Sequence, residues 1–544
     1  MKKDEVTRAC VPGFAGVSRD IAFNSEYISP DNTSRVVSWP VSVNGNAIGD
    51  ISASAVTLTL NFDADGESPL TINYADAGLM QLNVQYSGTG AESGLTMSGN
   101  DRFVSYPAGF CIQTDANAGE CSPAAPATYA DCPAFVKAGD NFNLNISAVG
   151  WQQAGDSDFC DNTPTPSFAL NNMALSTELV APSGGVNAVF NPAQYNHSAA
   201  TDNKNILTAN VSEVGVFNIR LTPDSNYHGV TLPPSVSTPT GRFYPHHFNV
   251  SELLSGQLQP YCSTDSAFAY SGQDINWQLA PVVEIQAQNA ANNLTQNYTQ
   301  AGFMKLPLNP AIFSLPTKDS SALANDGLPI SLSTVINAGS LTTAAAGILN
   351  YTLNALDDRF TYTKELRAEV DPFIPDLALT LNSFSDTDGA DITAPLALNI
   401  LSAFELRYGR LWLEDSYGPE TQNLLMPARA EYFSGGRFVQ NSDDSCWSYD
   451  SSTDASVSPS TLTSVQGNSR TLIRGRNTDA VLLQAPVLHA GTPDTGTATV
   501  GFNVPLWLQD DFDSNGSLDD PQATATFGIY RGHDRVIYWR EVRP

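Results

Sequence analysis

Two stretches of the same design decide the fold, DAGLMQL at residues 76–82 and EVGVFNI at residues 213–219. Each runs from an acidic residue through a small residue to a glycine and then alternates apolar and polar positions. Downstream of them lie YPAGF at 106–110 and YPHHF at 244–248. The first pair is offset by 137 residues and the second by 138. A constant offset over two separate motifs indicates consecutive copies of one unit.

Strand patterns extend outward from these repeats. VTLTLNF at 56–62 and FNLNI at 142–146 alternate with a period of two between turn residues, which is typical of half-buried strands. Long amphipathic helical patterns are nearly absent. We therefore predict an all-β chain of tandem Ig-like β-sandwich repeats followed by a C-terminal β-rich domain. The predicted boundaries are 1–105, 106–243, 244–400 and 401–544, with a mobile Ser/Thr-rich loop at 448–464.

Composition excludes some classes of function. The 544 residues carry 26 basic and 56 acidic side chains, a net charge of −30, and only seven residues are lysines. Such an acidic chain repels phosphate backbones, so nucleic acid is not an expected partner. No apolar stretch reaches the ~18 residues that a membrane-spanning helix needs, so no transmembrane segment is expected.

The start of the chain, MKKDEVTRAC at residues 1–10, lacks the apolar core of a signal peptide. Two interpretations compete: a cytosolic protein, or a chain that begins inside a longer exported one. We favour the second, because Asn, Ser and Thr are abundant and lysine is rare. The expected location is therefore extracellular or at the cell surface.

Cysteine spacing supports an oxidising compartment. Cys111, Cys121, Cys132 and Cys160 fall within 50 residues, which predicts one or two disulfides. Buried free thiols are the alternative interpretation. Because the total of seven is odd, at least one thiol is expected to be unpaired or to pair with an upstream segment, and Cys10 is the expected one.

Three segments of the last unit resemble the terminal domain of the MshQ family, from the mannose-sensitive haemagglutinin (MSHA) type IV pilus system. They are FELRYGRL at 404–411, PARAEYF at 427–433 running on to DDSC at 443–446, and the closing stretch 527–541. The resemblance covers roughly residues 100–544. It implies a surface-exposed, pilus-associated protein with minor pilins or other pilus components as partners. Its role would be that of an assembly factor, a tip component or an adhesin.

One loop has the spacing of a calcium site, DFDSNGSLDD at 511–520. Ca²⁺ needs six to eight oxygen ligands and a glycine at the sharp turn. The predicted ligands are the following: Asp511, Asp513, Asn515, the Ser517 carbonyl and Asp519. Position twelve is Gln522 instead of the bidentate glutamate of an EF-hand, so we expect one structural Ca²⁺ without flanking helices. An acidic Asn-Gly hairpin turn is the alternative. The acidic turns at 63–67 and 386–389 are expected to be solvated.

Histidine and tryptophan residues complete the candidates. His246 and His247 are expected to point to opposite faces of a strand and to be structural. Trp412 and Trp539 lie in alternating strands and are predicted core residues, whereas Trp447 is the predicted surface aromatic.

Catalytic patterns are missing from the sequence: no Gly-x-Ser-x-Gly elbow occurs, and no phosphate-binding glycine loop. We therefore predict a non-enzymatic surface component of an MSHA-like type IV pilus, acting in pilus biogenesis or as a pilus-associated adhesin. Two alternatives remain. One is a pilus-independent carbohydrate-binding surface protein with a surface glycan as its partner, and the other is a secreted polysaccharide-active enzyme.

Overall fold

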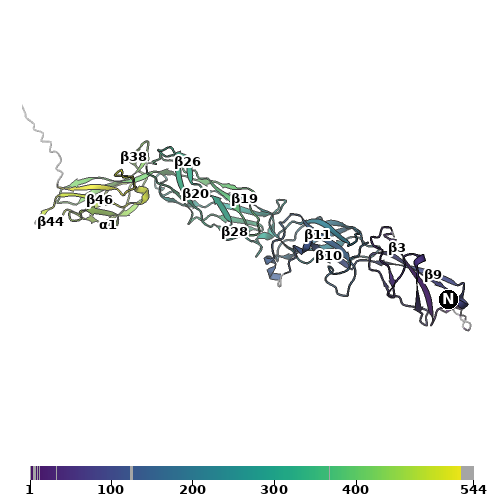
Figure 1. Cartoon of the computed structure of the whole chain (residues 1–544). Helices are drawn as coiled ribbons and strands as arrows, with labels where there is room; N and C mark the ends of the chain where they lie inside the picture. The colour runs from purple at the N-terminus through teal and green to yellow at the C-terminus, as the bar shows by residue number, and fades with distance from the viewer. Residues whose placement is uncertain are drawn as a thin grey trace, which may run out of the picture.

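The computed structural model describes residues 2–528 apart from 4–5, 7, 9, 12, 32, 123–125, 367 and 490; for 2, 3, 10, 11, 126, 127 and 489 it describes only the backbone. The chain forms an elongated array of β units placed end to end (Figure 1). Apart from one short pairing between residues 268–270 and 405–407, the strands pair within four groups, which we call unit 1 (18–105), unit 2 (109–243), unit 3 (247–401) and unit 4 (405–528). The all-β prediction is confirmed.

Unit 1 has one long sheet, and its remaining strands are very short. The sheet has the order β6-β3-β8-β9, all antiparallel. Its strands are β3 (Ser18–Ser29), β6 (Val56–Asn61), β8 (Gly78–Ser87) and β9 (Thr96–Ser105). The second sheet, β5-β4-β7, consists of β4 (Ser42–Val43), β5 (Asn46–Ala47) and β7 (Ile72–Asn73). Ahead of both lie β1 (Lys2–Lys3) and β2 (Cys10–Val11), and short 3₁₀ turns occur at Ser52–Ser54 and Gly90–Glu92.

Unit 2 is a complete sandwich of two sheets. The first has the order β10-β11-β15-β13, with β10 (Gly109–Thr114), β11 (Phe142–Val149), β13 (Phe190–Asn191) and β15 (Lys204–Val211). The second has the order β14-β12-β16-β17, with β18 also on β16; its strands are β12 (Leu170–Ala181), β14 (Gln194–His197), β16 (Gly215–Pro223), β17 (Ser235–Val236) and β18 (Thr240–Phe243). Strand β11 alternates buried and outward residues, as the sequence predicts.

Unit 3 is larger and contains several small sheets. One has the order β19-β24-β29-β28: β19 (His247–Leu254), β24 (Val282–Gln288), β28 (Ser340–Ala345) and β29 (Ile348–Thr352). Another has the order β22-β30-β27-β26: β22 (Asp274–Ile275), β26 (Lys318–Leu323), β27 (Pro329–Val335) and β30 (Arg359–Tyr362). The others pair β25 (Ala311–Ser314), β31 (Leu379–Phe384) and β32 (Leu396–Leu398), and β23 (Trp277–Leu279), β20 (Gly256–Leu258) and β33 (Ile400–Leu401).

Unit 4 has two main sheets. The first has the order β35-β37-β43-β41, with β38 also on β37: β35 (Gly409–Leu413), β37 (Leu424–Ser434), β38 (Arg437–Gln440), β41 (Val465–Gln466) and β43 (Arg476–Leu483). The second is β36-β47-β46-β40: β36 (Ser416–Gly418), β40 (Ala455–Ser458), β46 (Gly496–Phe502) and β47 (Gln522–Phe527). Short pairs join β39 (Ser448–Asp450) to β42 (Ser469–Thr471), and β44 (Leu488–His489) to β45 (Thr492–Pro493).

The predicted mobile loop at 448–464 is wrong for its first part. Residues 448–458 form β39, the single-turn helix α1 (Ser451–Asp454) and β40. Asp450 caps α1, because its Oδ1 accepts a hydrogen bond from the Ser452 backbone N–H at 2.9 Å. Most Ser and Thr side chains of this segment lie on the exposed side of the strands or in the first turn of α1, which explains why these residues are abundant here.

The hydrophobic cores continue from one unit into the next. The core of unit 2 includes Ala77 of unit 1, and the core of unit 3 includes Val214 and Val216 of unit 2. Phe268 and Tyr270, which lie early in unit 3, belong to the core of unit 4. Their strand β21 (Phe268–Tyr270) pairs in parallel with β34 (Glu405–Arg407). Neighbouring units therefore share buried surface and are not connected by linkers alone. Within the described residues, no helix is long and apolar enough to cross a membrane.

Candidate calcium site

The acidic loop of unit 4 lies between the 3₁₀ turn Leu506–Leu508 and strand β47. Asp510 and Asp519 form an antiparallel bridge that closes its neck: the Asp519 N–H donates to the Asp510 carbonyl at 2.9 Å, and the Asp510 N–H to the Asp519 carbonyl at 3.2 Å. At the turn, Ser514 and Gly516 have positive φ of 60° and 88°, a conformation that glycine adopts without a Cβ clash.

Charged side chains hold the neck on both sides. The Arg410 guanidinium pairs with Asp510 at 2.8 Å, and Asp520 Oδ1 accepts the Val504 N–H at 3.0 Å. The ammonium of Lys364, in unit 3, donates to the Trp507 carbonyl at 3.0 Å and also to the Gln509 carbonyl. These contacts place the start of the loop at the junction with unit 3.

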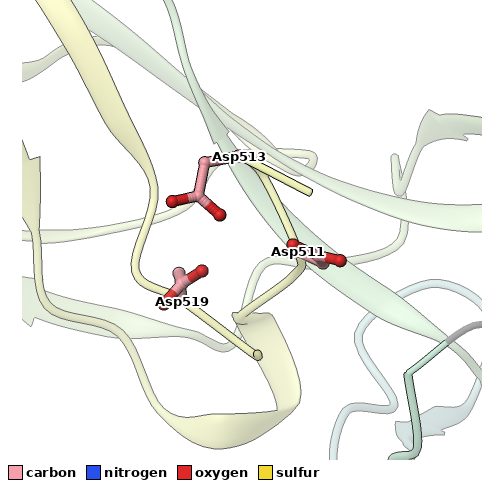
Figure 2. A group of neighbouring side chains, drawn as sticks. All are labelled: Asp511, Asp513 and Asp519. Atoms are coloured by element: carbon pink, nitrogen blue, oxygen red, sulfur yellow. The ribbon is translucent and has the colours of Figure 1, made fainter. Parts of the chain in front are cut away.

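Asp511, Asp513 and Asp519 come together at this loop (Figure 2). Each offers an oxygen within 4.8 Å of the others. Among the ion pairs of the described residues, none involves these three carboxylates. One Asp519 oxygen, Oδ2, is buried and has no hydrogen-bond partner. Three close carboxylates that pair with no basic side chain of the described residues, one with an orphaned oxygen, are a donor set that fits a hard divalent cation such as Ca²⁺.

The other two predicted ligands lie beside this group and are hydrogen-bonded to it. The Asn515 amide donates to Asp513 Oδ2 at 3.0 Å, and the Ser517 hydroxyl donates to Asp519 Oδ1 at 3.1 Å. Asn515 Oδ1 accepts the Ser517 N–H at 2.8 Å. Coordination by Asn515 would therefore require its amide to turn from these partners toward the cation.

The two weaker acidic turns have different surroundings. At 63–67, Asp63 Oδ1 accepts the N–H groups of Asp65 and Glu67 at 3.0 and 2.9 Å, which is an exposed turn held by its own side chain. The 386–389 turn is not the solvated turn that we expected. Asp388 pairs with Arg242 of unit 2, and Asp386 is buried.

The histidine pair does not point to opposite faces. His246 precedes β19 and His247 begins it, so strand alternation does not separate them, and their Nδ1 atoms lie 2.9 Å apart. His246 Nε2 is 3.6 Å from Asp140 of unit 2. The two histidines therefore lie where units 2 and 3 contact each other.

The tryptophan predictions were wrong for both described residues. Trp447 is buried, at 5% exposure, while Trp412 is 38% exposed. In β35, Leu411 and Leu413 face the core, so Trp412 between them faces outward. The Arg410 guanidinium lies over its ring at 5.2 Å. Trp539, like most of the closing stretch 527–541, lies outside the described residues.

Three disulfides occur among the described cysteine side chains. Cys111–Cys160 and Cys121–Cys132 confirm the predicted cluster in unit 2. Cys262–Cys446 joins units 3 and 4 across 184 residues and was not predicted. The Cys10 side chain lies outside the described part. These disulfides fit an extracellular protein, because such bonds form and persist in oxidising compartments.

Comparison with protein families gives four consecutive matches. They are to the four domains of a family described as DUF6701, a domain of unknown function whose first domain is Ig-like. The matched residues are 1–100 for the first domain, 106–206 for the second, 213–402 for the third and 407–542 for the fourth. No curated protein matches the chain.

Among solved structures, the chain is similar to invasin, a bacterial integrin-binding protein, at 9% identity and a TM-score of 0.26. That match covers 94% of this chain and 72% of invasin. A four-domain fragment of the ICAM-5 ectodomain matches at 11% identity and a TM-score of 0.24, covering 94% of this chain and 96% of the fragment. Scores at this level support no conclusion about function. The four ordered family matches span nearly all of the sequence, and the chain belongs to the DUF6701 family.

Proposed function

We propose that this protein is a non-enzymatic, surface-exposed stalk of an MSHA-like type IV pilus, acting in pilus biogenesis or as a pilus-associated adhesin. The observation that carries the proposal is the rod itself, four β units in line (Figure 1). Their hydrophobic cores continue across every junction. The MshQ-like segments of unit 4 support the pilus assignment. A stalk bearing shear needs junctions that do not bend freely, and each junction has specific contacts of that kind.

The junction between units 1 and 2 centres on Asp76, whose side chain is buried. Its Oδ1 accepts the N–H of Ala77 and the N–H of Ser167, in unit 2, both at 2.8 Å. The Ser167 hydroxyl accepts the Val36 N–H of unit 1 at 3.1 Å. A carboxylate that accepts backbone N–H groups from both units fixes their relative position.

Glu213 has the same role at the next junction. Its carboxylate accepts the N–H groups of Val214 at 2.9 Å, Gln296 at 3.0 Å and Asn297 at 3.2 Å, the last two in unit 3. Burial raises the pKa of this carboxyl group. Asp76 and Glu213 are the acidic residues of the repeated stretch, so the repeat encodes the junction contact as well as the strand.

Units 2 and 3 are further joined by a buried ion pair. Arg242 Nη2 donates to Asp388 Oδ1 at 2.7 Å, Nη1 donates to the other oxygen, and the side chains are 5% and 9% exposed. Paired geometry of this kind is the strongest form of the arginine–carboxylate contact. Removal of either partner would leave a buried charge uncompensated.

Units 3 and 4 are joined covalently and by a buried cation. Besides Cys262–Cys446, the Tyr270 hydroxyl donates to Asp444 Oδ2 at 2.9 Å and accepts from the Asn441 amide at 2.7 Å. Lys364 is buried and donates to the Gly409 carbonyl and to two carbonyls of the acidic-loop neck. Burial lowers the pKa of Lys364 to about 7. We infer that Ca²⁺ at Asp511, Asp513 and Asp519 would stiffen this junction further.

Gene deletion in the host tests the pilus assignment, with surface pili counted separately from attachment. Loss of pili would indicate a role in assembly, and loss of attachment with normal pili would indicate an adhesin. Complementation with Arg242→Met, which breaks one junction, should restore less attachment under flow than the exposed-surface control Arg102→Met. If deletion changes neither pili nor attachment, the pilus assignment fails and the carbohydrate-binding alternative gains ground.

The calcium proposal has its own test on the full chain. Because a ligand that binds only the folded state stabilises it, Ca²⁺ should raise the unfolding temperature of unit 4 and Mg²⁺ should not. Asp513→Asn should abolish the effect, while Asp65→Asn, in the other exposed acidic turn, should leave it unchanged. An unaltered response in Asp513→Asn would contradict the site.

A further inference from the structure

Two histidine rings meet where units 2 and 3 contact each other. The Nδ1 atoms of His246 and His247 lie 2.9 Å apart, and the two rings are perpendicular with their centroids separated by 5.1 Å. His247 is buried, whereas the His246 side chain is 36% exposed, so solvent reaches one side of the pair. Two ring nitrogens at this distance need a proton or a metal ion between them, because each nitrogen that carries no hydrogen presents a lone pair.

Strand β24 determines which nitrogen of His247 carries the hydrogen. Glu284, Gln286 and Gln288 alternate along this strand and therefore share one face. The Gln286 amide donates to Glu284 Oε1 at 2.8 Å, and the Gln288 amide donates to Gln286 Oε1 at 3.1 Å. Because an ionised carboxylate only accepts, this row runs in one direction and leaves Gln288 Oε1 facing His247 Nε2 at 3.1 Å. His247 therefore has its hydrogen on Nε2 and a lone pair on Nδ1.

His246 cannot satisfy both of its neighbours with a single hydrogen. Its Nε2 lies 3.6 Å from Asp140 Oδ1 in unit 2, and its Nδ1 faces the lone pair of His247. A hydrogen on Nδ1 leaves a lone pair beside the carboxylate, while a hydrogen on Nε2 leaves two lone pairs facing each other. A cation held by both Nδ1 atoms resolves the conflict, since the Nε2–H then faces Asp140. Burial lowers the pKa of His247, so this ring stays in the neutral form that binds metals.

The separation of the two nitrogens indicates which kind of metal ion fits. Two metal–nitrogen bonds of about 2.0 Å at a right angle place their nitrogens about 2.8 Å apart, and at the tetrahedral angle about 3.3 Å. The observed 2.9 Å is closer to the right angle, which is the geometry of tetragonal Cu²⁺ and Ni²⁺ sites. We propose that His246 and His247 bind one Cu²⁺ through their Nδ1 atoms, with water in the other positions.

The residues around the pair suit this role. Metal-binding histidines commonly donate their other ring N–H to a carboxylate or carbonyl oxygen, and here Asp140 and Gln288 occupy those positions. Among the described residues, no His, Cys, Asp or Glu joins the pair as a third close ligand, which leaves the remaining positions to water. Because Asp140 belongs to unit 2, Cu²⁺ on the pair would also strengthen the contact between units 2 and 3. The site does not depend on the pilus assignment.

Electron paramagnetic resonance of the full chain with equimolar Cu²⁺ tests the proposal, at about pH 8, above the ordinary pKa of imidazole. His246→Gln and His247→Gln each remove one Nδ1, and His246→Gln keeps an amide that can donate to Asp140. The matched control is His228→Asn, at an exposed histidine of unit 2 whose positive φ of 48° asparagine tolerates. Because His246 is partly exposed, its variant remains informative even if His247→Gln fails to fold.

We expect hyperfine splitting from two ring nitrogens, which the carboxylates of the acidic loop cannot produce. His246→Gln should remove the two-nitrogen pattern and weaken Cu²⁺ binding at least about tenfold, while His228→Asn should leave both unchanged. A spectrum without two nitrogen ligands, or one that His246→Gln does not alter, would overturn the proposal. So would loss of the pattern in His228→Asn, since the copper would then be bound elsewhere.

Discussion

Units 1 and 2 share one repeated stretch and one order of strands, but among the described residues only unit 2 is a closed sandwich. In unit 2, β10 and β11 cover the inner face, and Phe217 and Leu221 of the repeat are fully buried. In unit 1, Val84, which corresponds to Leu221, is half-buried and borders a groove. The repeat therefore encodes a sheet and a junction contact, whereas closure of the sandwich depends on strands outside it.

The junctions, unlike the cores, are alike in units 1 and 2. Asp76 and Glu213 occupy the same place in the repeat, and each accepts N–H groups from the following unit. The contact with the next unit is thus present in both units, although the described strands close the sandwich only in unit 2. Junction stiffness and core closure are separate properties of this fold, and substitutions can address them one at a time.

Truncation at matched core positions gives the largest expected contrast. Leu221→Ala should destabilise unit 2 by about 2–5 kcal/mol, because it leaves a cavity in a closed core. Val84→Ala should cost unit 1 about 1 kcal/mol or less, since the side chain is already partly solvated. Hydrogen exchange resolved by peptide measures each unit within the full chain. Similar costs in the two units would contradict an open groove in unit 1.

Low pH should destabilise unit 2 more than unit 1, and this is the next largest expected difference. His197 is buried in unit 2, with Nε2 2.7 Å from Asn203 Oδ1 and Nδ1 2.6 Å from the Tyr195 hydroxyl. Burial lowers the pKa of His197 from 6.5 to about 4. The unfolded chain takes up this proton near pH 6.5 and the folded unit only near pH 4, so stability falls as the pH drops through that window. The expected loss is about 3 kcal/mol.

Unit 1 contains no histidine and should show no such dependence. The control variant is His197→Gln, which should flatten the profile of unit 2 between pH 6.5 and 4. A profile that keeps its slope in this variant would assign the acid sensitivity to another group.

Removal of the junction carboxylates should have the smallest effect on stability. Glu213→Ala orphans three backbone N–H groups and Asp76→Ala two, so we expect costs of about 1–3 kcal/mol with the larger at Glu213. The amides of Gln296, Asn297 and Ser167 should exchange faster, whereas the core strands should stay protected. Unchanged exchange at these three amides would show that the carboxylates do not hold the junctions.

Alternation and repeat spacing were enough to predict an all-β chain, because strand period and turn residues are local properties. That the clustered cysteines of unit 2 form disulfides was likewise predictable, since four of them lie within 50 residues; which cysteine pairs with which was not. The sequence predicted that the side chains of Asp511, Asp513 and Asp519 come together in the acidic loop, and they do; Ca²⁺ binding there stays a prediction. The loop reverses direction at Ser514 and Gly516, and this spacing brings the aspartate side chains to the same side.

The contacts that join units could not be predicted from local pattern. Cys262 and Cys446 lie 184 residues apart, and Lys364 finds its acceptors only when unit 4 docks. The repeat did single out Asp76 and Glu213 as its acidic residues. That they accept hydrogen bonds from the following unit could not be read from the repeat alone. For Trp412 the strand alternation was visible, but which of its two faces the core covers was not. Trp447 precedes β39 and is buried in the core of unit 4, and no strand pattern in the sequence indicated this.

Small-angle X-ray scattering of the full chain in solution tests most directly the claim that the four units form one rigid stalk. The account predicts a scattering profile of a single extended rod, matching the arrangement in Figure 1, that changes in Arg242→Met and not in Arg102→Met. A profile that requires a broad ensemble of bent and compact arrangements in the unaltered protein would contradict it.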